Sequence, residues 1–425
     1  MDYKERYEER EAMREDTKWI VDAVEAVGKT ALRDGEYWRA TYTEEDAKAV
    51  ELLKSYMTES GMEVYFDAVG NLFGRLPGKD SQVIMTGSHR DTVRHGGKYD
   101  VMLGILTGLK AAASLYGQLG KPEKTVEVVA ICEEESSRFP LSSYAGSCHI
   151  SGQLQEEDLQ VTDGDGISMR EAMEKAGYLR EALSAGRKDL EHFVELHIEQ
   201  GGLLEDQEKQ VGIVTSIVGL FAGEVIFTGH QNHAGTTPMY LRKDPMPLAA
   251  EYIYRLHQWA DGYMEDMVCT VGKITAQPGN ANVIPAEVSF TFDIRSAKEE
   301  RLRQAEAVLL QLKKELEGNI AVEVRVACNE PPVQLDESGI EQLEKIAERR
   351  NLRFQKMTSG AGHDSQVIGQ KYRTNMVFVP SVDGVSHSTA EFTKAEDIDA
   401  GYLVLRDYLE TLAWQREGET CDEEK

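Results

Sequence analysis

Apolar runs that end abruptly in polar residues recur along the first half of the chain. The run Val83–Met85 leads into Thr86-Gly-Ser-His-Arg-Asp91, and the β-branched run Thr125–Cys132 leads into three glutamates, Glu133 to Glu135. A third run, from His192 to Gln200, ends in the same way. Near-continuous apolar runs are typical of strands buried on both faces of a sheet. The pattern therefore predicts an α/β fold with a doubly wound, mixed sheet and polar groups at its strand ends.

Segments with helical periodicity lie between and after these strands. The spacing of apolar residues predicts helices within the first thirty residues and over 102–116, 338–350 and 397–414. In the second of these, two glycines are expected to allow close packing on the sheet. A buried strand is predicted over 375–380, and the polar tail from Gly418 is expected to be disordered.

The pattern changes between Val214 and Cys328. Strands and helices follow there in the order βαββαβ, which forms a ferredoxin-like sandwich of four antiparallel strands with two helices on one face. Because the first pattern resumes afterwards, we predict that 214–328 is a domain inserted into a larger one, formed by 1–213 and 329–425. Within the insert, strands are expected over 223–229, 268–275, 286–294 and 320–327, and helices over 244–259 and 298–316.

Composition limits the classes of partner. The 425 residues carry 47 Lys and Arg against 74 Asp and Glu, a formal net charge of −27, which argues against binding to nucleic acid or to an anionic membrane surface. The five cysteines are scattered without a CxxC pair, so neither a disulfide framework nor a cysteine zinc site is indicated. A charged N-terminus and the lack of eighteen consecutive apolar residues argue against a signal peptide and a membrane span, so the cytoplasm is the expected location.

Histidines and acids gather at four separate strand ends. Taken alone, the His89 stretch is equally well explained as a polar turn, and Glu133 to Glu135 as a surface acidic cluster, but four such ends are hard to explain by chance. Imidazole together with carboxylate suits Zn, Mn, Co or Ni better than Ca or Mg. The candidate residues are His89, Asp91, Asp100, Glu134, Glu135, His197, His363, Asp364 and His387.

Eight motifs, in order along the chain, resemble those of one family. It is the amidase/hydantoinase/carbamoylase branch of the M20 metallohydrolases, which holds N-carbamoyl-L-amino-acid hydrolases, allantoate amidohydrolases and β-ureidopropionases. The resemblance extends from about Gly35 to Leu412. The motifs are Gly87-Ser-His-Arg-Asp-Thr-Val93, Gly96-Gly-Lys-Tyr-Asp100, Glu133-Glu-Glu-Ser-Ser-Arg-Phe139, Glu195-Leu-His-Ile-Glu-Gln-Gly201, Asn232-His-Ala-Gly-Thr-Thr-Pro-Met239, Asn282-Val-Ile-Pro285, Gly360-Ala-Gly-His-Asp364 and Ser386-His-Ser388.

The resemblance implies a centre of two divalent metal ions (Zn, Mn, Co or Ni) in each subunit. Asp100 would bridge the two ions, His89 and His197 would complete one site, and Glu135 and His387 the other. Glu134 would be the general base and Asp91 would orient His89. Peptidases of the wider clan usually carry a carboxylate at the position of His197, which favours the amidase branch over an aminoacylase or dipeptidase.

The resemblance also implies a substrate site and a homodimer. Arg295 would bind a substrate carboxylate, supported by Asn282, Gln200 and the backbone of Gly362. The residue matching His233 reaches the active site of the other subunit in the family and stabilises the oxyanion there. The competing interpretation of Arg295 is a salt bridge on a strand edge.

The sequence departs from the family pattern in three places, of which the third bears on the substrate. Val101 and Ser136 each stand where a glycine is usual, and Leu220-Phe221-Ala222 stands where relatives often have arginine. An arginine there helps to bind the second polar arm of allantoate. We therefore expect a dinuclear amidohydrolase of N-carbamoyl-L-amino acids, with allantoate or another ureido acid as the alternative substrate. A peptidase or aminoacylase is less favoured, and an inactive binding relative is opposed by the retention of Glu134 and all metal ligands.

Overall fold

The chain divides into two compact units. The computed structural model describes residues 13–33, 36–141, 144–180 and 182–415. Unit 1 comprises Met1–Thr215, Gln334–Ser359 and His363–Lys425, and unit 2 comprises Ser216–Val333 and Gly360–Gly362. Unit 2 is thus inserted in the sequence of unit 1, and a short segment of a later loop belongs to it as well. The tail from Gly418 lies outside the described residues.

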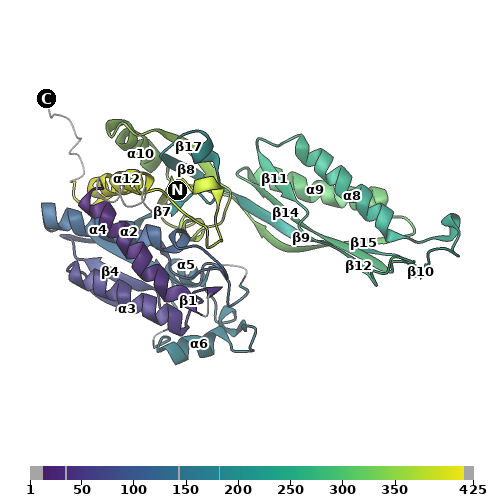
Figure 1. The fold of residues 1–425 in the computed structure, drawn as a ribbon, viewed down its shortest axis with the longest axis horizontal. Coiled ribbons are helices and arrows are strands. Elements are labelled where there is room, and N and C mark those ends of the chain that lie inside the picture. Colours follow the sequence, from purple (N-terminus) through teal and green to yellow (C-terminus); the bar gives the residue numbers. More distant parts are fainter. Residues whose placement is uncertain (1–12, 34–35, 142–143, 181, 416–425) are drawn as a thin grey trace. The chain divides into compact units, whose positions relative to one another are not determined.

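Unit 1 is built on a mixed sheet of nine strands (Figure 1). The strand order is β16-β8-β18-β7-β5-β6-β4-β3, and β17 pairs with β8. The four central strands β18, β7, β5 and β6 are mutually parallel, whereas β8 runs antiparallel to β18, β4 to β6 and β3 to β4. The strands are β3 (Glu63–Phe66), β4 (Leu72–Leu76), β5 (Asp80–His89), β6 (Lys124–Ile131), β7 (Leu190–Ile198), β8 (Val211–Ile217), β16 (Val333–Gln334), β17 (Phe354–Ser359) and β18 (Arg373–Val379).

Helices cover both faces of this sheet. Successive residues of β5 face opposite sides: a side chain at Gly108 of α4 would meet Thr86, while Met85 packs with Ile150 of α5 and Ile368 of α11. Helices α2 and α12 pack on α4, and α10 packs on α12. The mixed α/β fold is therefore confirmed. The helices are α2 (Glu15–Gly28), α3 (Glu44–Glu59), α4 (Tyr99–Leu119), α5 (Ala145–Ser151), α6 (Met169–Ala176), α7 (Leu203–Asp206), α10 (Glu337–Arg349), α11 (Asp364–Ile368) and α12 (Ala395–Ala413).

Helix α4 begins at Tyr99, earlier than the predicted start at Met102. The apolar periodicity is clear only from Met102 onward, although Tyr99 in the first turn is also buried. Asp100 lies in the first turn of this helix. A Cβ at Gly104 would overlap the carbonyl oxygen of Leu196, which confirms the predicted close packing on the sheet. None of the described helices is long and apolar enough to cross a membrane.

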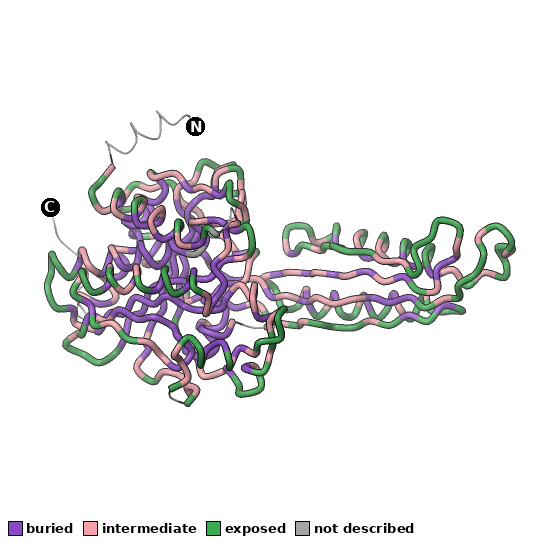
Figure 2. The backbone as a smooth tube through the Cα atoms, turned by 60° about the horizontal axis from the view of Figure 1, so that its bottom comes forward, coloured by how far each residue is buried: buried purple, intermediate pink, exposed green. Residues whose placement is uncertain are grey.

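Unit 2 is an antiparallel sheet with α8 and α9 packed on it (Figure 1). Burial alternates along β14, so one strand face lies in the apolar core (Figure 2). The strand predicted over 268–275 is in fact two strands, β11 and β12, which both pair with β14. Three residues between them oppose two on β14, a bulge that interrupts the strand. The elements are β9 (Gly219–Thr228), β10 (Asn232–His233), α8 (Pro245–Asp261), β11 (Met267–Thr270), β12 (Ile274–Gln277), β13 (Val283–Ile284), β14 (Glu287–Ser296), α9 (Glu299–Leu316) and β15 (Ala321–Glu330).

A buried polar cluster joins β7, β18 and α12. His192 Nε2 lies 2.8 Å from Asn375 Oδ1, and the Tyr408 hydroxyl donates to the same oxygen at 2.8 Å. An amide oxygen only accepts, so His192 carries a proton on Nε2. Its Nδ1 has no hydrogen-bond partner among the described residues. Burial lowers the pKa of His192 to about 4.

This cluster predicts acid sensitivity of unit 1. Between the ordinary histidine pKa near 6.5 and the folded value of about 4, the unfolded chain takes up a proton at His192 that the folded chain does not. The free energy of unfolding should therefore decrease as the pH is lowered through this window, by on the order of 2 kcal/mol from pH 7 to pH 5. Urea unfolding of the His192→Gln variant should show a shallower pH dependence than the wild type. The exposed His230 of unit 2 supplies the control, His230→Gln; equal pH dependence in all three proteins would contradict the assignment.

Candidate metal centre

The candidate ligands come from the C-terminal ends of parallel strands. His89 ends β5, Glu134 and Glu135 follow β6, and His197 lies near the end of β7. His387 lies in the loop after β18. Parallel strands end at one edge of a sheet, so these side chains meet there although they are far apart in the sequence. Asp100 joins them from the first turn of α4.

Asp100 lies between two groups of ligand atoms. Its Oδ1 is 3.2 Å from His197 Nε2, and its Oδ2 is 3.1 Å from His387 Nε2. The nitrogen of His387 is in turn 3.5 Å from Glu135 Oε1. Ligand atoms of Asp100 with His89 and His197, and of Asp100 with Glu135 and His387, each lie within 4.8 Å of one another. One carboxylate is therefore shared by two groups, each suited to one metal ion.

The hydrogen bonds of His89 and His197 leave the Nε2 atom of each ring available for metal binding. His197 Nδ1 lies 2.9 Å from the carbonyl oxygen of Ile198, and His89 Nδ1 lies 3.2 Å from that of Asp91. Carbonyl oxygens only accept, so both rings carry their protons on Nδ1 and their lone pairs on Nε2. The buried Nε2 of His197 makes no hydrogen bond within the described residues. The donor set thus fits a divalent cation of the zinc or manganese type.

The acids of the cluster are unfavourably crowded without cations. Burial, and then the charges of Glu135 and Asp364, raise the pKa of Glu134 well above its usual value. Burial and Asp100 do the same to the pKa of Glu135. Burial would also raise the pKa of Asp100, but hydrogen bonding to His387 and the nearby imidazoles outweigh it, and the net pKa is lowered. That hydrogen bond raises the pKa of His387 to about 9. Cations at this position would relieve the repulsion.

The Asp91 carboxylate bonds mainly to the strand end that carries the glutamates. It accepts the backbone N–H of Glu134 at 3.1 Å and that of Glu135 at 3.0 Å. Its nearer carboxylate oxygen is 3.9 Å from His89 Nδ1, while the backbone oxygen of Asp91 makes the closer contact with that ring. Asp91 therefore links the His89 and Glu134–Glu135 strand ends.

Backbone strain is concentrated around these ligands. Glu133, Ser136, Gln200 and His387 have φ angles of 54°, 49°, 59° and 52°, in the left-handed region that favours glycine. Ser136 is one of the positions where the family pattern has glycine, and its φ accounts for that preference. For Val101 the structure shows only that its backbone continues α4.

Gln200 and His363 also lie at this centre. Gln200 Nε2 donates to Asp100 Oδ1 at 2.9 Å, so its contact is with a candidate ligand. The rings of His363 and His197 are 4.6 Å apart, and His363 Nε2 is 2.9 Å from Ser359 Oγ. Asp364 is buried, and its carboxylate oxygens have no hydrogen-bond partner in the described part of the chain.

The structure adds two acids that the sequence pattern did not single out. Glu195 accepts hydrogen bonds from the hydroxyls of Ser88 at 2.8 Å and Ser365 at 2.6 Å. Glu391 accepts the backbone N–H groups at the start of α4. The sequence held one indication of such a residue. Lys98 precedes α4, and its side chain has no oxygen that could accept hydrogen bonds from the first N–H groups of the helix.

His233 and Asn282 lie side by side in unit 2. His233 lies in β10, which pairs with β13, and Asn282 directly precedes β13. The backbone N–H of Ala234 donates to the carbonyl oxygen of Asn282 at 3.0 Å. Both side chains are exposed. His233 Nδ1 accepts the backbone N–H of Gly235 at 3.0 Å, which leaves the proton of a neutral ring on Nε2.

Arg295 lies at the other end of unit 2, near the end of β14. Its guanidinium donates to both carboxylate oxygens of Asp293, at 2.9 and 3.1 Å, and to the carbonyl oxygen of Gly360 at 3.0 Å. Gly362 follows in the same loop. An open groove of about 970 Å³ runs past Arg295, Asp293 and Gly360 within this unit.

The apolar segment Leu220-Phe221-Ala222 of β9 points its side chains to both faces of the sheet. Phe221 is buried in the core of unit 2, with its ring 5.2 Å from that of Phe292, and so faces away from Arg295. Leu220 is the residue paired with Arg295 across the two strands. The apolar neighbour of the arginine is therefore Leu220 rather than Phe221.

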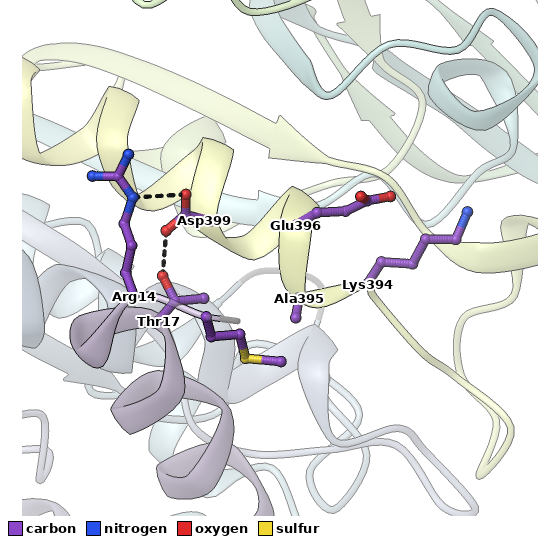
Figure 3. A pocket seen from close by; sticks show the side chains of 7 residues that line it. Arg14, Thr17, Lys394, Ala395, Glu396 and Asp399 are labelled. Atoms are coloured by element: carbon purple, nitrogen blue, oxygen red, sulfur yellow. Dashed lines mark hydrogen bonds and ion pairs between the residues drawn. The ribbon is translucent and has the colours of Figure 1, made fainter. Parts of the chain in front are cut away.

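A separate pocket of about 300 Å³ lies where α2 and α12 begin (Figure 3). Thr17 donates a hydrogen bond to Asp399, and Arg14 pairs with the same carboxylate at 3.2 Å. Lys394 pairs with Glu205 at 3.5 Å. These charges satisfy one another, and no group of metal-binding side chains is found there among the described residues.

Comparison with known proteins identifies the family of this chain. The model of peptidase family M20/M25/M40 matches residues 77–411. The allantoate amidohydrolase of Bacillus subtilis (strain 168) is 41% identical over 93% of this chain and 97% of its own length. The N-carbamoyl-L-amino-acid amidohydrolase of Paenarthrobacter aurescens is 38% identical over 88% and 92%. The crystal structure of a hydantoinase/carbamoylase family amidase from Burkholderia multivorans is 31% identical, with a TM-score of 0.87 over 94% of this chain and 98% of that one. The chain therefore belongs to peptidase family M20/M25/M40, in the hydantoinase/carbamoylase amidase branch, and is a hydrolase that acts on amide C–N bonds.

Proposed function

We propose that this protein uses two divalent metal ions to hydrolyse N-carbamoyl-L-amino acids to the amino acid, CO2 and ammonia. The observation that carries the proposal is the position of Asp100, whose two oxygens face two different ligand groups. Such a shared carboxylate is expected of a centre that holds two ions side by side. His89 and His197 would complete one site, and Glu135 and His387 the other.

When bound, the two ions would supply Lewis-acid chemistry, which lowers the pKa of a water and polarises the carbamoyl oxygen. Glu134 has the position for proton transfer, since its carboxylate is buried and lies 3.9 Å from His89 Nε2. It would take a proton from the attacking water and return it to the leaving nitrogen. The water oxygen bonds to the carbamoyl carbon, the bond to the amino-acid nitrogen breaks, and the released carbamic acid divides into CO2 and ammonia.

Arg295 would bind the substrate carboxylate. Asp293 already holds its guanidinium in one orientation through two hydrogen bonds, which reduces the loss of side-chain entropy on binding. Leu220, across the strand pair, supports an apolar or uncharged substrate end. Allantoate is the second candidate, and it is favoured by the 41% identity to an allantoate amidohydrolase.

We also propose a catalytic homodimer, because residues expected to bind the same substrate lie far apart within a single chain. His233 and Asn282 lie before the start of β14, whereas Arg295 lies near its end. Eight residues of extended strand span roughly 27 Å, more than an N-carbamoyl amino acid can bridge. A second copy would bring the His233 end of unit 2 to a site whose Arg295 belongs to its partner.

Substrate hydrolysis is the first test. The metal-loaded protein should release equal amounts of ammonia and free amino acid from an N-carbamoyl-L-amino acid, as measured by coupled ammonia assay and amine derivatisation. Ammonia from allantoate but not from carbamoyl amino acids would replace the proposal with the second candidate. Free amine from dipeptides without any ammonia from ureido compounds would exclude both.

The role of Glu134 can be separated from metal binding. Glu134→Gln should lower kcat by about 10²- to 10⁴-fold, because it removes a general base. Its metal content should stay at that of the wild type when measured by elemental analysis. Glu63→Gln, at an exposed position, is the control. Loss of one ion per subunit would make Glu134 a ligand instead, and an unchanged kcat would refute the mechanism.

Complementation tests the homodimer. We expect His233→Ala and Glu134→Gln each to be nearly inactive alone. Heterodimers of the two variants, purified with two different affinity tags, should regain about half of the wild-type activity, since one of their two sites receives an intact His233 and contains an intact Glu134. If His233 acted within its own chain, both sites of the heterodimer would be defective and no activity would return.

A further inference from the structure

We propose that Glu391 is a positioning residue for the metal centre, whose carboxylate fixes Asp100 and the His387 loop relative to each other. The inference rests on the dinuclear centre proposed above. Glu391 lies in the segment between β18 and α12 and is only 5% exposed. It is separated from Asp100 by 291 residues in the sequence.

The first contact is with the start of α4. The Lys98 side chain makes no capping hydrogen bond to this helix. Glu391 Oε1 instead accepts the backbone N–H groups of Tyr99 and Asp100, each at 2.9 Å. A carboxylate is a favourable group at this position, because the first N–H groups of a helix have no partner within it and carry a partial positive charge. Glu391 thus caps the turn from which Asp100 projects.

The second contact is with the loop that carries His387. Glu391 Oε2 accepts the hydroxyl of Ser386 at 3.0 Å, and that hydroxyl is also 3.4 Å from Asp100 Oδ2. His387 follows directly, with its Nε2 3.1 Å from the same oxygen of Asp100. One carboxylate therefore holds the backbone of the shared ligand with one oxygen and the loop of a second ligand with the other.

The third contact explains why residue 97 is a glycine. A Cβ at Gly97 would overlap the carboxylate of Glu391. The turn before α4 therefore leaves space that this side chain occupies. Because Glu391 joins the turn at the start of α4 to the His387 loop, its loss should let α4 and that loop shift separately. That shift would change the spacing of the ligands around Asp100.

The affinity of the full-length protein for Zn²⁺ alone tests this inference, measured by competition with a chromophoric chelator. Glu391→Gln should bind Zn²⁺ about 10- to 100-fold more weakly, the range found when a group supporting metal ligands is removed. Glu391→Asp, which keeps the charge, should retain more affinity than Glu391→Gln. Wild-type affinity in Glu391→Gln would overturn the proposal, whatever its thermal stability.

Gly97→Ala gives an independent approach from the other side of the contact, because it leaves the Glu391 side chain in the chain. It should weaken Zn²⁺ binding in the wild type, because the new methyl group displaces the carboxylate. In a Glu391→Ala background the same change should have little further effect. Additive effects would show that the two residues act separately, and would overturn the proposal.

Asp336→Asn is the matched control for helix capping. Asp336 accepts the backbone N–H of Gly339 at 2.8 Å at the start of α10, and it is not among the candidate ligands. Its loss should lower the melting temperature without changing the affinity for Zn²⁺. An equal loss of affinity in Asp336→Asn would attribute the Glu391 effect to general destabilisation. The measurement needs no substrate, so it decides the role of Glu391 even if no ureido acid proves to be hydrolysed.

Discussion

Carboxyl groups removed from water repel one another, and at the edge of the unit 1 sheet this repulsion is concentrated. Asp91, Asp100, Glu134 and Glu135 are buried or nearly so around one point. Burial and the neighbouring carboxylates raise the pKa values of Glu134 and Glu135, and hydrogen bonding to Asp100 raises that of His387 to about 9. Divalent cations would favour the charged carboxylates and the neutral imidazole, so metal binding would be coupled to proton release.

Hydrogen bonds from the surrounding structure hold these groups in place. Asp91 accepts backbone N–H groups from the strand end of the glutamates, and Glu391 does the same at the start of α4. Ser381 accepts the backbone N–H of Gln200, a residue with positive φ. Left-handed backbone at non-glycine residues costs on the order of 1 kcal/mol or more each, and persists where neighbouring contacts determine the conformation. Strain and repulsion thus occur together, at the place where ligand geometry matters most.

The local sequence pattern predicted those features that depend on residues close together in the sequence. Polar groups that directly follow an apolar strand lie at a sheet edge, which located His89, Glu134 and His197, and periodicity located most helices. The bulge between β11 and β12 was missed because Val271 and Ile274 continue the β-branched run across it. The contacts of Glu391 were missed because bonds from a side chain to a distant backbone leave no periodic signal.

The position of β18 in the sheet has a consequence for biosynthesis. β18 lies between β7 and β8, yet it follows all of Ser216–Val333 in the chain. During translation β7 and β8 leave the ribosome first, with a gap between them that their later partner must fill. The segment that carries His387 and Glu391 emerges later still. The complete set of candidate ligands therefore exists only after unit 2 and the loop beyond β18 have been synthesised.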